Sequence, residues 1–147
     1  MKKVLAVDYG AKHIGLASGD DSNRIAFPRD VIMRRDDDQA LAALLDVVRE
    51  GEYGMVVFGA PLNMDGGKSR QYEVTMEFVE KFRVALVAGG EKVGREVTVE
   101  VIDERLSSFE ADEMLEGFEG TGMRKKEGDR DVMAAKVILE RWLEGGV

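Results

Sequence analysis

Apolar residues in this chain recur with two different periods, one typical of strands and the other typical of helices. Five apolar runs flanked by turn residues predict β-strands, at residues 3–8, 14–19, 25–33, 55–58 and 96–102. The first three runs are joined by short connections, which predicts an antiparallel meander. Pro28 lies within the third run, so we expect that strand at a sheet edge or with a bulge.

Segments with apolar residues three or four positions apart predict helices. They cover approximately residues 36–50, 69–88, 107–118 and 129–143. The inward stripe of the first helix would consist of Leu41, Leu44, Leu45 and Val48. The consecutive aspartates Asp36–Asp38 suit the positive end of this helix dipole, and Gly51 is expected to stop the helix.

This order of elements predicts an α/β fold. A three-strand antiparallel meander followed by helices that alternate with two parallel strands gives a mixed five-stranded sheet with helices on both faces. The chain has 147 residues, of which 44% are hydrophobic, so its core is large enough to fold alone. We therefore expect a single domain over residues 1–147, without an internal repeat or a linker.

The bulk composition narrows the possible classes of protein. The formal net charge is −8, whereas a nonspecific nucleic-acid binder is usually basic, although a local basic face can coexist with an acidic total. The absence of cysteine excludes a disulfide scaffold and thiolate zinc sites. No apolar run approaches the ~18 residues of a membrane span, and the first run is too short for a signal peptide. We therefore expect a cytoplasmic protein without membrane contacts.

Acidic residues lie at the ends of two of the predicted strands. Asp8 ends the first apolar strand, and Asp103 and Glu104 follow the fifth. An acid at the exit of a buried strand is costly unless a metal, a cation or water satisfies it. Two strands that end in acid indicate a shared site at one edge of the sheet, where α/β proteins usually carry out their chemistry.

Four sequence blocks strengthen this interpretation. They read D-Y-G-x-K-x-I-G-x-A at 8–17, G-x-P-x-N-M-D-G at 59–66, D-E-R-L-S-S-x-E-A at 103–111 and D-x-x-A-A-x-x-I-L at 131–139. In this order and spacing they resemble the YqgF (RuvX) family of RNase H-like nucleases over essentially the whole chain. The resemblance implies an RNase H-like fold and a hydrolase that cleaves phosphodiester bonds at the 5′ end of pre-16S rRNA in ribosome biogenesis. The alternative within this family is a Holliday junction resolvase that acts on branched DNA in recombination.

The resemblance also implies a metal site. Asp8, Asp103, Glu104 and Asp131 would hold two Mg²⁺ or Mn²⁺ ions, and Asp8, Glu104 and Asp131 would be catalytic. Such ions can supply an activated water, a shielded phosphate and help for the leaving oxygen. Adjacent strand residues face opposite sides, so only one of Asp103 and Glu104 should face the ions, and Glu104 is slightly favoured. Asp131 lies in the first turn of the last helix, where a carboxylate also interacts favourably with the helix dipole.

Basic and polar residues close to these blocks are the candidates for nucleic-acid contacts. They are Lys12, Asn63, Arg105, Arg124, Lys125 and Lys126. The basic run at 124–126 precedes the last helix and could clamp a nucleic-acid backbone, with a solvated charge run as the alternative. His13 is the single histidine, and we expect it to be solvated rather than catalytic. The expected partners are pre-rRNA or branched DNA, and ribosomal particles.

Two classes other than a nuclease stay open from the sequence. The first block also resembles the phosphate-binding hairpin of actin-like and sugar-kinase ATPases, but those proteins need two domains, and a P-loop lysine motif is absent. A non-catalytic nucleic-acid-binding module for ribosome assembly is the second alternative. Oligomeric state bears on the substrate, because a junction resolvase needs two symmetric active sites, whereas an RNA-trimming enzyme could act as a monomer.

Overall fold

The computed structural model describes residues 2–20, 22, 25–60, 69–89, 97–103 and 129–144. Its elements are β1 (Lys3–Tyr9), β2 (His13–Asp20), β3 (Phe27–Met33), α1 (Asp37–Gly51), β4 (Met55–Ala60), α2 (Arg70–Ala88), β5 (Thr98–Asp103) and α5 (Asp129–Leu143). Each lies where the apolar pattern predicts it, within a few residues. The helix predicted over 107–118 lies outside the described residues.

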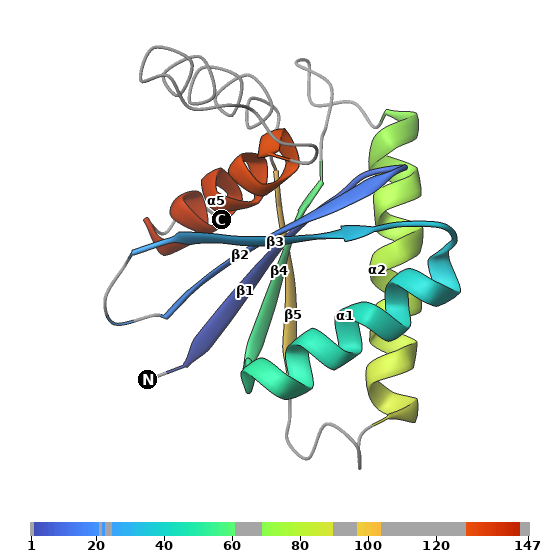
Figure 1. Cartoon of the computed structure of the whole chain (residues 1–147), viewed down its shortest axis with the longest axis horizontal. Helices are drawn as coiled ribbons and strands as arrows, with labels where there is room; N and C mark the ends of the chain where they lie inside the picture. Colours follow the sequence, from blue (N-terminus) through green and yellow to red (C-terminus); the bar gives the residue numbers. More distant parts are fainter. Residues whose placement is uncertain are drawn as a thin grey trace.

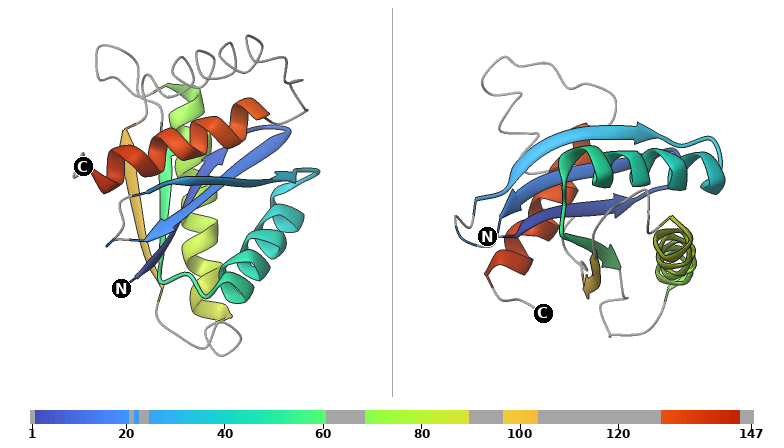
Figure 2. Two further views of the ribbon diagram at one scale, coloured as in Figure 1. Left: turned by 60° about the vertical axis from the view of Figure 1, so that its left-hand side comes forward. Right: turned by 90° about the horizontal axis from the view of Figure 1, so that it is seen from below.

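One mixed sheet of five strands forms the centre of the molecule, in the order β3-β2-β1-β4-β5. β1, β2 and β3 form the predicted antiparallel meander, and β4 and β5 run parallel to β1. Helices α1 and α2 cover one face of the sheet and α5 covers the other (Figures 1 and 2). Pro28 lies in the edge strand β3, whose pairing with β2 shifts register between Gly15 and Ala17. The α/β fold with helices on both faces is therefore confirmed.

Two buried clusters, one on each face, hold these layers together, and β1 contributes to both. Leu5, Val7 and Tyr9 belong to the cluster under α1 and α2, whereas Val4 and Ala6 belong to the cluster under α5. Because strand side chains alternate between faces, position 8 follows Val4 and Ala6 and lies on the α5 side. The alternation that builds the core thus fixes the face to which the predicted metal-binding acid belongs.

The end of α1 differs from the sequence prediction. Gly51 does not stop the helix but is its last residue, and Glu52 adopts the left-handed conformation with φ of 56°. A Cβ at Gly51 would lie 2.3 Å from the Tyr53 ring, so this glycine is required by a close contact.

None of the helices described is long and apolar enough to cross a membrane.

Candidate functional site

Gly15 brings the start of α5 directly onto the sheet beside Asp8. In the antiparallel register of β1 and β2, Asp8 lies opposite Gly15. A Cβ at Gly15 would lie 2.0 Å from the carbonyl oxygen of Asp131 and 2.8 Å from the backbone nitrogen of Val132. Only a residue without a side chain permits this approach, so Gly15 fixes the first turn of α5 over the position opposite Asp8.

Asp8 and Asp131 are therefore gathered at one end of the sheet. Asp8 is half-buried at the carboxyl end of β1, and the Asp131 side chain, 26% exposed, projects from the first turn of α5. The Asp131 Oδ1 atom lies 3.7 Å from the position of a Cβ at Gly10, which places this carboxylate against the turn that follows β1. Residues separated by 123 positions thus meet because helix and hairpin pack backbone to backbone.

His13 also belongs to this group, which the sequence did not predict. Its Nδ1 lies 3.4 Å from Asp131 Oδ2, and its side chain is 19% exposed. The expectation that His13 is simply solvated was therefore wrong. A lone histidine beside a turn carries no sequence feature that reports on a helix more than a hundred residues away, so only tertiary packing reveals this contact.

The remaining predicted residues divide into two sets. Lys12 is exposed in the turn between β1 and β2, and its ammonium has no side-chain partner among the residues that the structure describes. The backbone of Asp103 ends β5 and pairs with Ala60 of β4. β1 and β5 flank β4, so their ends lie about 10 Å apart across the sheet. Outside the described residues lie Asn63, Glu104, Arg105, Arg124, Lys125 and Lys126.

The donor chemistry of the described acids suits a hard divalent cation. Asp8 and Asp131 offer carboxylate oxygens, and Mg²⁺ is usually held by one or two carboxylates together with water and substrate phosphate. Within the described part of the chain, no group of three or more acidic, histidine or cysteine side chains forms a metal cluster. Asp8 and Asp131 are thus carboxylates of a kind that a divalent cation accepts, but they do not by themselves make up such a cluster.

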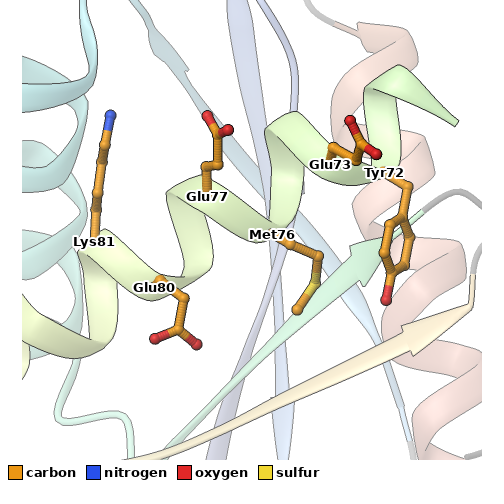
Figure 3. A pocket seen from close by; sticks show the side chains of 6 residues that line it. All are labelled: Tyr72, Glu73, Met76, Glu77, Glu80 and Lys81. Atoms are coloured by element: carbon orange, nitrogen blue, oxygen red, sulfur yellow. The ribbon is translucent and has the colours of Figure 1, made fainter. Parts of the chain in front are cut away.

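A separate open hollow of about 650 Å³ lies along the outer side of α2, on the other face of the sheet (Figure 3). Among the described residues its lining consists of Tyr72, Glu73, Met76, Glu77, Glu80 and Lys81. Three of these six side chains are acidic, and Figure 3 shows Glu73 and Glu77 projecting from one side of the helix. An acidic wall repels phosphate, so the described lining of this hollow does not favour a nucleic acid.

Comparison with known proteins identifies the family of the chain. The RuvX family, described as Holliday junction resolvase, matches residues 2–145. A protein of Anaeromyxobacter sp. (strain Fw109-5), named "Putative pre-16S rRNA nuclease", is 39% identical over 143 residues, which are 97% of each chain. A protein of the same name from Maridesulfovibrio salexigens is 36% identical over 141 residues, covering 96% of this chain and 97% of that one.

Solved structures agree on the fold. A structure described as T. thermophilus RuvC in complex with Holliday junction substrate superposes with a TM-score of 0.58 at 17% identity, covering 99% of this chain and 96% of that one. The fowlpox virus resolvase, solved with substrate Holliday junction DNA, gives a TM-score of 0.55 at 12% identity, with 97% of both chains covered. At such low identity these two likenesses establish the fold only, whereas the family match covers nearly every residue. The chain belongs to the RuvX family.

Proposed function

We propose that this chain is a metal-dependent nuclease that hydrolyses phosphodiester bonds, and that it processes the 5′ end of pre-16S rRNA in the cytoplasm. One observation carries this proposal: Gly15 seats the helix that bears Asp131 opposite Asp8. Membership of the RuvX family supports a nuclease, and the names of its relatives support an rRNA substrate. The acidic pair accounts for part of the net charge of −8, which therefore does not argue against a nucleic-acid substrate.

Asp8 and Asp131 would hold the cations, with Glu104 as a third ligand. The alternation of side chains along β5 supports Glu104 over Asp103 as the third ligand. Ile102 belongs to the cluster under α5, and Glu100 accepts a hydrogen bond from Trp142 of that helix, whereas Val99 and Val101 pack on the opposite cluster. By this alternation an even-numbered position 104 would fall on the side where Asp8 and Asp131 lie.

The side chains around these acids have distinct tasks in hydrolysis. Bound Mg²⁺ or Mn²⁺ would lower the pKa of water and shield the charge of the phosphate. Lys12, exposed in the adjacent turn, would bind a phosphate beside the scissile one and so orient the backbone for in-line attack. His13 contacts Asp131 Oδ2 and would restrict the rotation of that carboxylate. Asn63, Arg105, Arg124, Lys125 and Lys126 stay proposed nucleic-acid contacts on the family resemblance alone.

A four-way DNA junction is the second candidate substrate. The description of the family favours it, because RuvX is described there as a Holliday junction resolvase. Junction cleavage requires two symmetric active sites, so this alternative requires a homodimer, whereas rRNA processing is compatible with a monomer.

Both substrates are tested in one experiment. A labelled, 5′-extended 16S rRNA fragment and a labelled four-way junction are incubated side by side with Mg²⁺, with Mn²⁺ or with chelator. The variant Asp8→Asn tests the proposed ligand, and Asp46→Asn is the matched control, because Asp46 is an exposed aspartate in α1. We expect metal-dependent cleavage of the rRNA fragment, retained in Asp46→Asn and lost in Asp8→Asn.

The other outcomes are also decisive. Cleavage of the junction alone would replace the rRNA substrate by branched DNA. Binding without cleavage of either substrate under every metal condition would refute the nuclease and favour a binding module for ribosome assembly. Full cleavage by Asp8→Asn would refute the proposed site even if the wild-type protein is active.

A further inference from the structure

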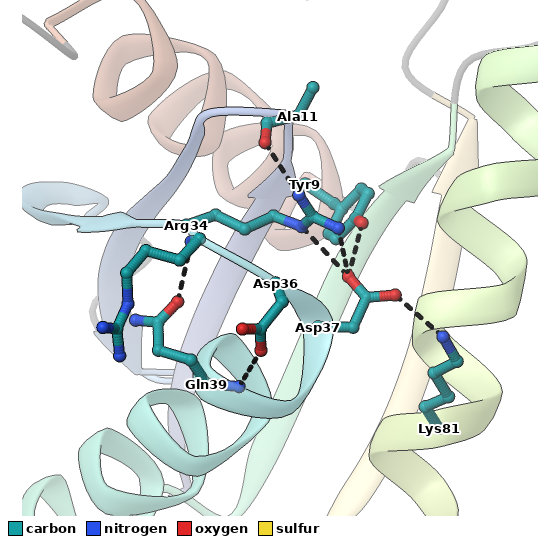
Figure 4. Close-up of polar contacts among 8 residues, drawn as sticks. Tyr9, Ala11, Arg34, Asp36, Asp37, Gln39 and Lys81 are labelled. Atoms are coloured by element: carbon teal, nitrogen blue, oxygen red, sulfur yellow. Dashed lines mark hydrogen bonds and ion pairs between the residues drawn. The ribbon is translucent and has the colours of Figure 1, made fainter.

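A polar cluster on the face opposite α5 joins three elements and the segment after β3 around one carboxylate. The Asp37 cluster consists of Tyr9 at the end of β1, Arg34 after β3, Asp37 in the first turn of α1 and Lys81 in α2 (Figure 4). The Tyr9 hydroxyl donates to Asp37 Oδ1 at 2.7 Å, and Arg34 Nε donates to the same oxygen at 3.0 Å. Lys81 Nζ donates to Asp37 Oδ2 at 2.9 Å. The carboxylate is thus shared by three donors.

Helix capping does not explain the position of Asp37. The N-cap of α1 is Asp36, whose side chain accepts a hydrogen bond from the backbone nitrogen of Gln39 at 2.8 Å. The helix is also anchored to the core through the buried residues Ala40, Leu44 and Val48. Asp37 therefore makes its tertiary contacts in addition to those that already hold α1 in place.

Arg34 connects the cluster to the turn between β1 and β2. Its guanidinium donates from Nη1 to the carbonyl oxygen of Ala11 at 3.0 Å, as Figure 4 shows. Its backbone nitrogen donates to the carbonyl oxygen of Lys12 at 2.8 Å. Gln71 of α2 donates to the carbonyl oxygen of Tyr9 at 3.3 Å, at the start of the same segment. The carbonyl groups of residues 9, 11 and 12 therefore all accept hydrogen bonds from residues outside the β1–β2 hairpin.

The protonation states of Asp37 and Tyr9 allow the hydrogen bonds of the cluster to persist at neutral pH. Burial raises the pKa of Asp37, but hydrogen bonds from Lys81, Tyr9 and Arg34 outweigh it and hold that pKa below its ordinary value. Burial, and then the hydrogen bond to Asp37, raises the pKa of Tyr9. Asp37 is therefore ionised and Tyr9 protonated at neutral pH, so the hydrogen bonds persist.

We propose that Asp37 and Arg34 are positioning residues of the nuclease site, which fix the turn that presents Lys12 to a phosphate of the nucleic-acid backbone. The inference rests on the proposed function. The Arg34 guanidinium, which Asp37 orients, donates to the carbonyl oxygen of Ala11, and the Arg34 backbone nitrogen donates to that of Lys12. Without Asp37, the exposed Lys12 samples many positions and contributes less to binding.

The direction in which Asp37→Asn changes the affinity for a nucleic acid distinguishes a positioning role from an effect of overall charge. Asp37→Asn removes a negative charge, so an effect through the overall field would tighten the binding of a polyanion. Loss of positioning weakens it instead. Asp46→Asn makes the same change in charge further along α1, in an aspartate that forms the comparable ion pair Asp46–Arg49 at 3.0 Å.

The experiment measures binding of a fluorescein-labelled 5′-extended 16S rRNA fragment and of a labelled four-way DNA junction by anisotropy, in EDTA so that no cleavage occurs. We expect Asp37→Asn to weaken binding about three- to tenfold and Asp46→Asn to leave it unchanged or slightly tighter. In the Lys12→Gln background, Asp37→Asn should have little further effect, because its contribution acts through Lys12. A general loss of structure would not produce this dependence on Lys12.

A second pair of variants keeps the inference testable if Asp37→Asn does not fold. Arg34→Gln is compared with Arg49→Gln, and only the former should weaken binding, again with little further loss in the Lys12→Gln background. Equal binding by Asp37→Asn and Asp46→Asn, or full additivity with Lys12→Gln, would overturn the inference while wild-type cleavage upholds the nuclease. A wild-type protein that neither binds nor cleaves either nucleic acid would overturn both.

Discussion

Replacing Gly15 by alanine is the most direct test of how α5 is seated. The new Cβ would lie 2.0 Å from the Asp131 carbonyl oxygen, 2.2 Å from its carbon and 2.8 Å from the nitrogen of Val132. All three are backbone atoms, so no side-chain rotation relieves the contact. Ordinary van der Waals contact begins at 3.4 Å, so the first turn of α5 must move by about 1.4 Å relative to β2, the difference from 2.0 Å.

The helix cannot move this far without cost. Its residues Ala134, Ala135, Ile138 and Leu139 are almost completely buried against the sheet. Overpacking of such a core typically costs about 1–3 kcal/mol, which lowers the melting temperature of a chain of this size by about 3–10 °C. Movement of the first turn also carries Asp131 away from its place beside Asp8, and a misplacement of about 1 Å can cost about 10²-fold in rate.

Thermal unfolding and the cleavage rate at saturating substrate and metal are measured on the same preparations. Gly54→Ala is the matched control, because a Cβ there meets only the flexible side chain of Lys2, whose Cγ lies at 3.0 Å. We expect Gly15→Ala to lose both stability and rate and Gly54→Ala to lose neither. A Gly15→Ala protein with wild-type melting temperature and rate would refute the close packing of α5 on β2.

Two further predictions concern side chains around the site. His13→Ala should raise the Mn²⁺ concentration needed for half-saturation about tenfold, measured by calorimetry, and His13→Asn should restore part of the affinity because its amide can contact the same carboxylate; equal affinity in all three proteins would contradict a role for His13. Asp37→Asn should lower the free energy of unfolding at pH 7 by about 1.5–3 kcal/mol, because Asp37 accepts hydrogen bonds from two cations and a hydroxyl. The folded pKa of Asp37 is depressed, so this contribution is complete above the unfolded value of about 3.9 and is lost as the pH falls through the folded pKa. Urea unfolding at pH 7 and below pH 3 should therefore show the gap between the two proteins closing in acid, and a gap independent of pH would count against the ion pairs.

The strands of the sheet could be predicted from the sequence because the apolar pattern of each strand and the short connections between them are local features. The apolar runs of β1 and β4 are visible in the chain, and the short connections of the first three strands predict their antiparallel pairing. The alternation of side chains along β1 assigns Asp8 to the face that α5 covers. Composition, by contrast, was a weak guide, because a net charge of −8 does not report where the charges lie.

The contacts that assemble the site could not be predicted in this way, because they join distant segments. The three aspartates Asp36–Asp38 look alike in the sequence, yet Asp36 caps α1, Asp37 binds two residues that are distant in the sequence, and Asp38 is exposed. Gly51 was predicted to stop its helix, but it accommodates the Tyr53 ring. In each case the residue type is suited to several roles, and the neighbours supplied by folding select one.

The distribution of charge explains how an acidic protein can act on a polyanion. Among the described residues, Glu73, Glu77 and Glu80 lie along α2, on the face of the sheet opposite α5. Asp8 and Asp131, which we propose as cation ligands, lie on the α5 side, with the exposed Lys12 in the turn beside them. The acidic residues of α2 disfavour a nucleic acid on that face, whereas Lys12, our proposed phosphate contact, lies at the hairpin turn; an acidic total is therefore compatible with binding in one orientation. The Asp37 cluster lies on the α2 side of the sheet and includes Lys81 of that helix; it pairs its own carboxylate internally, and in our proposal it positions Lys12 for a phosphate.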